Sequence, residues 1–149
     1  SNLFDIKVIH IAKDPRGFVY SMTKNAPEKL KATIRFALRW LGENLIFTAF
    51  LRKHMLKENY RFLRYEDLAS QPEKEMRALY RWLGIRSDYD FSVHDFRTVE
   101  NHAISGNQMR WEMTEIVLDQ KWKKRLPRLN QKICWMIAWS LARFYQYEK

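Results

Sequence analysis

A short apolar segment that runs straight into a charged, proline-containing turn most constrains the fold. Residues 6–12 (IKVIHIA) are apolar, rich in β-branched side chains and bounded by polar residues, which is typical of a buried strand. In the sequence that follows, KDPRGFVYSMTK, Asp14 is a natural N-cap. Pro15 suits the first helical position, where its missing N–H is not needed. The segment therefore predicts a strand followed at once by a helix.

The remaining elements follow from apolar spacing and from breaker residues. Apolar side chains spaced by three or four residues predict a long helix over about residues 28–58, with Gly42 as a point of kinking or division. Residues 60–65 (YRFLRY) predict a second strand, and residues 72–84 predict a helix opened by proline and closed by glycine. Residues 85–110 are expected to form a polar loop, and the last third of the chain to be helical. The side chains expected to face inward include Leu30, Ile34, Ala37, Leu41, Leu45, Met76, Leu79, Tyr80, Leu83, Ile133, Trp135, Ile137, Trp139, Leu141 and Phe144.

The order strand, helix, long helix, strand, helix resembles the second half of a parallel α/β unit. Two strands alone make a poor sheet, and parallel strands normally have neighbouring strands and helices on both faces. We therefore expect a helix-rich α/β fold with a partial parallel sheet, whose first strands would lie upstream of residue 1. A complete but unusually helix-rich small domain is the alternative.

The charge balance favours anionic ligands. Lys and Arg number 27 against 17 Asp and Glu, a net charge of +10, which suits phosphate, sulfate, acidic polysaccharide, nucleic acid or an anionic membrane face. The single cysteine, Cys134, excludes an internal disulfide and a multi-cysteine zinc site. The four histidines have no metal-binding spacing, and no apolar run reaches the ~18 residues of a transmembrane helix. No metal and no membrane-spanning segment is expected.

Lys13 and Ser21 are the first candidate binding residues. At the carboxyl end of a parallel strand, side chains and the N–H groups of the next helix converge on the crevice where α/β folds bind ligands. Lys13 would supply a point charge for a phosphate there, and Ser21, about two turns into the helix, would reach the same anion if the helix packs alongside. A surface lysine and a helix-packing serine are the alternative interpretation.

Two later segments complete a recognisable set. LRYEDL (residues 63–68) is followed by Pro72 and LYRWLG (residues 79–84), and HAISGNQMR (residues 102–110) is followed by Asp119 and Trp122. Together with the first turn, in this order, these segments resemble the 3′-phosphoadenosine 5′-phosphosulfate (PAPS)-dependent sulfotransferases. The resemblance extends from about Lys7 to Tyr147, and its third segment is similar to carbohydrate-type and bacterial members.

This resemblance implies roles for five residues. In the family, a strand ending in Arg-Asp-Pro-Arg, with a serine eight residues after the first arginine, binds the 3′-phosphate of the nucleotide. Lys13 and Ser21 would hold that phosphate here, and Arg110 would contact it again. Tyr65 would lie near the adenine. Arg16 is ranked lower because its side chain is expected to point to solvent.

The sequence departs from the family in two ways. Lys13 replaces the usual arginine, which keeps the charge but loses the bidentate fork, so weaker binding is expected. The Gly-x-Pro-Arg-Ser-Gly-Thr-like loop that cradles the 5′-phosphosulfate is absent from the sequence, and the catalytic base of the family also lies upstream. The resemblance thus implies that residues 1–149 are the C-terminal part of one sulfotransferase domain. That domain would be a three-layer, P-loop-like fold lacking its first strands, with its catalytic residues outside this chain.

The implied parent enzyme transfers a sulfuryl group from PAPS to a hydroxyl of a carbohydrate-like, possibly anionic acceptor, without a metal and without a nucleic-acid partner. A bacterial cytoplasm is the preferred compartment, and the Golgi lumen the alternative for an animal enzyme. The basic run over residues 121–132 is expected to be a solvated helix face with Trp122 turned inward. Lys123 and Lys124 are weaker candidates for binding the acceptor.

Two other function classes stay open. A non-enzymatic basic module would bind nucleic acid or acidic polysaccharide through residues 121–132, with affinity that falls steeply with salt. A nucleotide kinase-like domain would share the parallel sheet, but its Gly-x-x-x-x-Gly-Lys loop is missing. His10 and the Glu66-Asp67 pair are expected to be structural, and His102 to be a solvated loop residue.

Overall fold

The computed structural model describes residues 6–55, 57–85 and 117–148. The chain forms two compact units, residues 1–66 together with 119–149, and residues 67–118, which are described separately. No helix in the described ranges combines the length and apolar character that crossing a bilayer requires.

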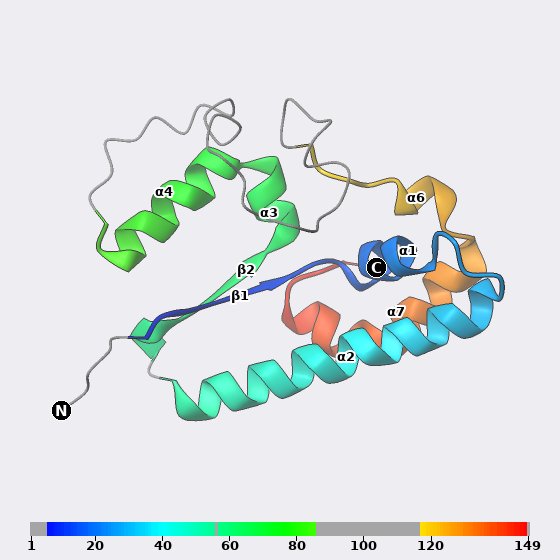
Figure 1. The fold of residues 1–149 in the computed structure, drawn as a ribbon, viewed down its shortest axis with the longest axis horizontal. Coiled ribbons are helices and arrows are strands. Elements are labelled where there is room, and N and C mark those ends of the chain that lie inside the picture. The colour runs from blue at the N-terminus through cyan, green and yellow to red at the C-terminus, as the bar shows by residue number, and fades with distance from the viewer. Residues whose placement is uncertain (1–5, 56, 86–116, 149) are drawn as a thin grey trace. The chain divides into compact units, whose positions relative to one another are not determined.

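The first unit contains a sheet of two parallel strands, β1 (Val8–Ala12) and β2 (Tyr60–Arg64). Val8 pairs with Tyr60 and Ala12 with Arg64, so the two strands end together. The connection between them consists of three helical elements, as parallel pairing requires a long crossover (Figure 1). These elements are α1 (Pro15–Thr23), α2 (Lys29–His54) and the short 3₁₀ helix η1 (Lys57–Asn59). The predicted order of strand, helix, long helix and strand is confirmed.

Two C-terminal helices complete the first unit, α6 (Trp122–Arg125) and α7 (Arg128–Phe144). Helix α7 packs against both α1 and α2. The short helix α3 (Tyr65–Ser70) follows β2 without a break and was not anticipated from the sequence. Helix α2 runs through Gly42 as one element, so the predicted division there is wrong.

The second unit contains α4 (Pro72–Leu83), which begins and ends as predicted. Pro72 occupies the first turn, where no N–H partner is needed. Gly84 adopts φ 74°; its N–H donates to the carbonyl of Arg81 at 3.2 Å, and the N–H of Ile85 donates to the carbonyl of Tyr80 at 3.0 Å. A left-handed glycine of this kind satisfies carbonyl groups that would otherwise lack a partner at the helix end.

Strand β1 is buried on one face only, which corrects the prediction of a buried strand. His10 and Ala12 face inward, whereas Ile9 and Ile11 are 38% and 51% exposed. Successive side chains of a strand point to opposite faces, and only one of these faces is covered by the described residues.

The inward face of α2 is also displaced from the predicted one. Ala37 is fully buried, as expected, but Leu30, Ile34 and Leu45 are 44%, 39% and 53% exposed. The positions that face the core are instead Thr33, Trp40, Thr48 and Leu51 together with Ala37. Apolar residues occupy more than one face of α2, so their spacing alone did not identify the face that packs.

The core of the first unit forms where α1, α2 and α7 meet. In α7, Trp135 and Leu141 are buried as predicted, but Trp139 and Phe144 are 52% and 49% exposed, so their assignment to the core is wrong. The main cluster consists of Ala12, Trp40, Trp135, Ala138, Leu141, Ala142, Tyr145 and Tyr147. A smaller one consists of Val19, Ala37 and Cys134.

Candidate functional site

The carboxyl ends of β1 and β2 bring two of the predicted binding residues together. Lys13 follows β1 and Tyr65 follows β2, and the two strands end in register. The Lys13 Nζ lies 4.6 Å from the centroid of the Tyr65 ring, within the range of a cation–π contact. Burial raises the pKa of the Tyr65 hydroxyl. An ammonium and an aromatic face are thus side by side at the edge where α/β sheets bind ligands.

Gly17 makes room for the Lys13 side chain on the first turn of α1. A Cβ at position 17 would lie 3.0 Å from Lys13 Cε and 3.2 Å from Trp122 Cδ1. Ser21 is four residues further along α1 and so shares the helix face on which Gly17 lies. Ser21 is exposed, Lys13 is half-buried and Gly17 is buried.

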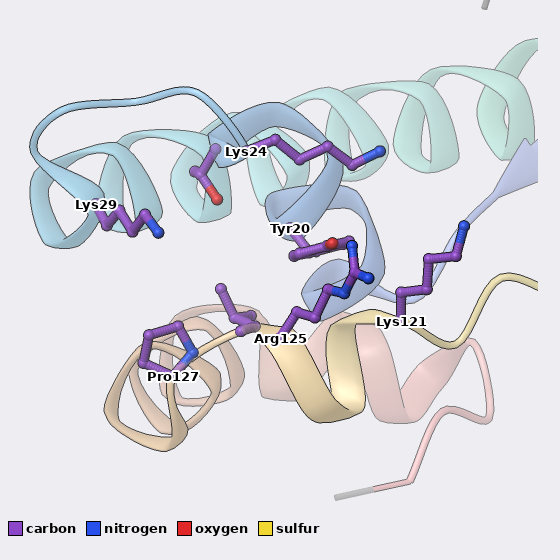
Figure 2. Close-up of a pocket in the computed structure, with 8 residues that line it drawn as sticks. Tyr20, Lys24, Lys29, Lys121, Arg125 and Pro127 are labelled. Carbon is purple, nitrogen blue, oxygen red and sulfur yellow. The ribbon is translucent and has the colours of Figure 1, made fainter. Parts of the chain in front are cut away.

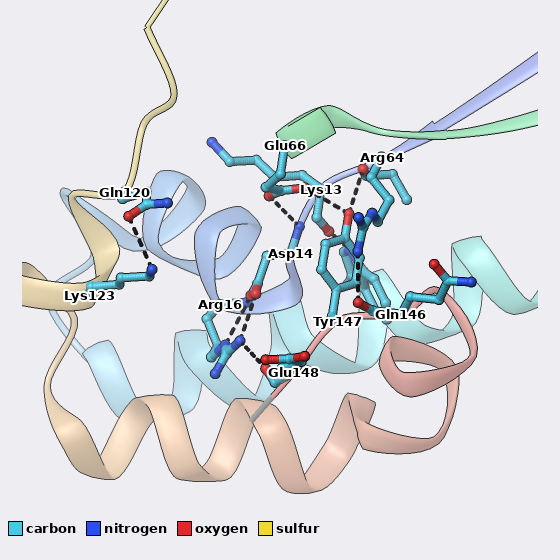
Figure 3. Close-up of polar contacts among 12 residues, drawn as sticks. Lys13, Asp14, Arg16, Arg64, Glu66, Gln120, Lys123, Gln146, Tyr147 and Glu148 are labelled. Carbon is cyan, nitrogen blue, oxygen red and sulfur yellow. Dashed lines mark hydrogen bonds and ion pairs between the residues drawn. The ribbon is translucent and has the colours of Figure 1, made fainter. Parts of the chain in front are cut away.

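The turn itself is held by Glu66 and by the C-terminal tail (Figure 3). The backbone N–H of Asp14 donates to Glu66 Oε1 at 2.9 Å. The Tyr147 hydroxyl lies 2.8 Å from Glu66 Oε2 and 2.9 Å from the carbonyl oxygen of Ala12. Burial, followed by the nearby Glu66 carboxylate, raises the pKa of Tyr147. Glu66 is thus structural, as expected from the sequence.

Arg16 points inward, and the expectation that its side chain faces solvent is wrong. Its guanidinium bonds both carboxylate oxygens of Asp14, with Nη2 2.7 Å from Oδ2 and Nε 3.0 Å from Oδ1. Nη2 also donates to the backbone carbonyl of Glu148 at 2.6 Å. The guanidinium carbon lies 4.4 Å and 4.7 Å from the rings of Trp122 and Trp135, and the side chain is 11% exposed.

This arrangement explains why Arg16 turns inward. A planar guanidinium forms two parallel bonds to one carboxylate and stacks on aromatic faces, which a lysine does not do. Asp14 also caps α1 by accepting from the backbone N–H of Arg16 at 2.8 Å. The Asp-x-Arg spacing in the sequence was a signal for this ion pair that the sequence reasoning missed.

The other candidate binding residues do not lie at the carboxyl ends of the strands in the described part of the structure. Arg110 and His102 lie outside the described residues. Lys123 and Lys124 are exposed on α6, where Lys123 Nζ donates to Gln120 Oε1 at 3.0 Å. Trp122 is buried beside them, as predicted. Of the five residues assigned from the resemblance, the structure describes Lys13, Arg16, Ser21 and Tyr65, and it brings Lys13 and Tyr65 into contact.

His10 is structural, as predicted. Its Nε2 lies 3.1 Å from Asn44 Oδ1, and the Asn44 amide nitrogen donates to the carbonyl of Trp40. Nε2 therefore carries the proton, and Nδ1 accepts from the Tyr60 hydroxyl at 3.0 Å. Burial lowers the pKa of His10, partly offset by the bond to Asn44, so the ring is held in its neutral form.

Known proteins similar to this chain include carbohydrate sulfotransferases. Carbohydrate sulfotransferase 1 of Homo sapiens is 27% identical over a match that covers 74% of this chain and 34% of that protein. Carbohydrate sulfotransferase 3 of Tetronarce californica is 26% identical, with 87% of this chain and 34% of that protein covered. The chain therefore spans about a third of the length of these relatives.

Two solved structures share the fold. The sulfotransferase domain from the Synechococcus PCC 7002 olefin synthase superposes with a TM-score of 0.70 at 23% identity, covering 94% of this chain and 50% of that one. The sulfotransferase domain from the curacin biosynthetic pathway gives a TM-score of 0.63 at 17% identity, covering 95% and 54%. The predicted class, a helix-rich α/β fold like that of sulfotransferases, is confirmed. The model of the sulfotransferase family matches residues 4–89, more than half of the sequence, and this chain belongs to that family.

Proposed function

We propose that this chain provides the nucleotide-binding part of an enzyme that transfers a sulfuryl group from PAPS to a hydroxyl of a carbohydrate-like acceptor. The observation that carries the proposal is the contact of Lys13 with the Tyr65 ring at the carboxyl ends of β1 and β2, next to the helix α1 that contains Ser21. These groups fit a 3′-phosphoadenosine moiety, because an ammonium and a hydroxyl bind a phosphate while an aromatic ring packs on a base.

Each residue has a distinct part in this proposal. Lys13 neutralises the 3′-phosphate, Ser21 donates a hydrogen bond to it, and Tyr65 packs near the adenine. Arg110 adds a second cation to the same phosphate. Arg16 is a positioning residue, because its guanidinium donors are bound to Asp14 and to the Glu148 carbonyl.

The transfer step needs groups that these residues do not supply. The acceptor oxygen forms a bond to sulfur as the bond from sulfur to the phosphate oxygen breaks, and the acceptor proton passes to a base. The products are a sulfate ester and 3′-phosphoadenosine 5′-phosphate. In the family, the phosphosulfate loop stabilises the charge that develops on the transferring group. The sequence motif of this loop is not found in these 149 residues. We therefore propose that residues 1–149 form the C-terminal part of a single sulfotransferase domain and hold the nucleotide without completing the catalytic centre.

Calorimetric titration with 3′-phosphoadenosine 5′-phosphate tests the proposal. The chain should bind this nucleotide more tightly than adenosine 5′-phosphate, which lacks the 3′-phosphate. Lys13→Ala should weaken binding of 3′-phosphoadenosine 5′-phosphate by about tenfold to a hundredfold, the value of one charged hydrogen bond. The affinity for adenosine 5′-phosphate should stay unchanged.

Two variants serve as controls. Lys13→Arg keeps the charge and should retain binding, whereas Lys57→Ala, which removes an exposed lysine in η1, should leave the affinity unchanged. Equal affinities for the two nucleotides, or equal losses in Lys13→Ala and Lys57→Ala, would reject the proposal. The second of these results would favour a basic module that binds polyanions without recognising the 3′-phosphate.

A further inference from the structure

A basic pocket of about 330 Å³ lies in the first unit beside the C-terminal half of α1. Its walls come from the end of α1, the start of α2 and the segment around α6 (Figure 2). Four of its lining side chains are cationic, namely Lys24, Lys29, Lys121 and Arg125, and Tyr20 contributes a ring. The sequence indicated one half of this pocket, the basic run over residues 121–132, but not its combination with α1, because the two halves are about a hundred residues apart in the chain.

Among the described residues, no ion pair compensates the positive charge of this pocket. None of the described residues that line the pocket is acidic. In the ranges covered by the structure, none of the four side-chain cationic groups forms an ion pair within 4 Å of a carboxylate oxygen, and the Asp119 carboxylate accepts from the backbone N–H of Lys121 at 3.0 Å. The nearest acidic residue along the chain from Lys29 is Glu28, which pairs with Lys31 at 2.7 Å.

Two local features add to the positive potential. Lys121 and Arg125 are four residues apart around a helical turn, a spacing at which like charges repel. Lys29 is the first residue of α2, a helix with no acidic residue in its first turn and no side-chain bond at its N-cap. The positive end of the helix dipole therefore reinforces the lysine charge. A bound anion would relieve this repulsion.

The size and walls of the pocket favour a sugar unit over a bare ion. A volume of about 330 Å³ lies at the lower end of small-molecule sites. The Tyr20 ring, the buried Leu126 and Pro127 supply apolar surface against which the C–H face of a pyranose can pack. The cations stand around this surface, with Lys24 Nζ 5.5 Å from the centre of the Tyr20 ring.

We propose that this pocket binds a sulfated or uronic-acid sugar unit of the acceptor glycan. The inference rests on the proposed sulfuryl transfer to a carbohydrate. It places the acceptor glycan beside the C-terminal half of α1. The neighbouring residues Tyr20 and Ser21 then face acceptor and nucleotide respectively. Lys121 and Arg125 take the role that the sequence had assigned to Lys123 and Lys124, since these two do not line the pocket.

Binding of a chondroitin 4-sulfate tetrasaccharide, measured by calorimetry at fixed ionic strength, tests this assignment. The double variant Lys24→Gln/Lys29→Gln should weaken binding by at least about tenfold, because it removes two charged partners. The matched control is Lys53→Gln/Lys57→Gln, which removes one exposed lysine near the C-terminal end of α2 and one in η1 and should change the affinity by less than about twofold. Maltotetraose, which is uncharged, should bind much more weakly than the sulfated tetrasaccharide.

The outcomes separate this inference from the proposed function. Affinity for 3′-phosphoadenosine 5′-phosphate should be the same in the pocket variant as in the unmodified chain. Failure of that nucleotide to bind would reject the proposed function, whereas the tetrasaccharide titration reports on the pocket independently.

Four results would overturn the pocket assignment. The first is absence of tetrasaccharide binding, and the second is an equal loss in the two double variants, which would indicate diffuse polyanion binding. The third is saturation of the pocket by inorganic sulfate as tightly as by the tetrasaccharide, which would mark a site for a free oxyanion. The fourth is loss of nucleotide binding in Lys24→Gln/Lys29→Gln, which would assign the pocket to the donor.

Discussion

The turn after β1 and the basic pocket beside α1 are both built from charged residues, but among the residues that the structure describes only the charges of the turn have partners of opposite charge. In the turn, Arg16 is bound by Asp14 and stacked between two tryptophans, and Glu66 is bound by a backbone N–H and by Tyr147. In the pocket, four exposed cations have no carboxylate within ion-pair distance among the described residues.

We infer from this difference that the charges of the turn stabilise the fold, whereas the charges of the pocket bind a ligand. A buried ion costs several kcal/mol unless it is paired and hydrogen-bonded, so the turn depends on its partners. An exposed cation remains hydrated, so leaving it without a partner costs little folding free energy. Such a cation is therefore available to bind an anionic ligand. The comparison predicts that stability depends on the turn and that ligand affinity depends on the pocket and on Lys13.

Arg16→Ala should have the largest effect. The substitution leaves the Asp14 carboxylate buried without its cation and empties the space between Trp122 and Trp135, at a cost of about 3–5 kcal/mol in the free energy of unfolding. Urea denaturation followed by circular dichroism measures this loss. In the same assay Lys24→Gln/Lys29→Gln should remain within about 0.5 kcal/mol of the unmodified chain. Comparable losses of unfolding free energy in the two variants would show that the turn and the pocket contribute equally to stability, against this prediction.

Gly17→Ala should have an intermediate effect that links the turn to the nucleotide site. The added methyl group would meet Lys13 Cε and the Trp122 ring, so we expect a loss of about 1–3 kcal/mol in stability and weaker binding of 3′-phosphoadenosine 5′-phosphate. The matched control is Gly42→Ala, where the structure places nothing within 4 Å of the new Cβ. That change lies inside α2 and should stabilise the chain by about 0.5–1 kcal/mol. Denaturation and calorimetry measure the two effects, and unaltered nucleotide affinity in Gly17→Ala would disconnect Gly17 from the placement of Lys13.

The smallest effect concerns His10, a buried group whose partners favour its neutral form. Because folding lowers the pKa of His10 below its ordinary 6.5, the unfolded chain binds the proton more readily. The stability from this residue is complete above about pH 6.5 and is lost as the pH falls toward the lower pKa of the folded state. His10→Gln should therefore reduce the slope of unfolding free energy against pH between about 7 and 5. His54→Gln, at an exposed position in α2, should retain that slope. An unchanged slope in His10→Gln would show that other titrating groups cause the pH dependence of stability in this range.

The sequence by itself determined the local elements and their order. Asp14 and Pro15 specify the start of α1, and Gly84 specifies the end of α4, because capping and backbone geometry act within a few residues. Two apolar segments separated by a long helical interval predicted parallel strands, since such a crossover is what parallel pairing needs. The placement of Lys13 at the end of β1 followed from the same pattern.

Only the tertiary structure decided which faces pack and which charges are paired. The hydrogen bonds from Arg16 to Glu148 and from Tyr147 to Glu66 join segments more than eighty residues apart, and the basic pocket likewise combines residues of α1 and α6. The exposure of Ile11, Trp139 and Phe144 is likewise set by what covers them and not by their own apolar character. Periodicity reports the conformation of one segment, whereas burial and charge compensation depend on the segments that meet it in space.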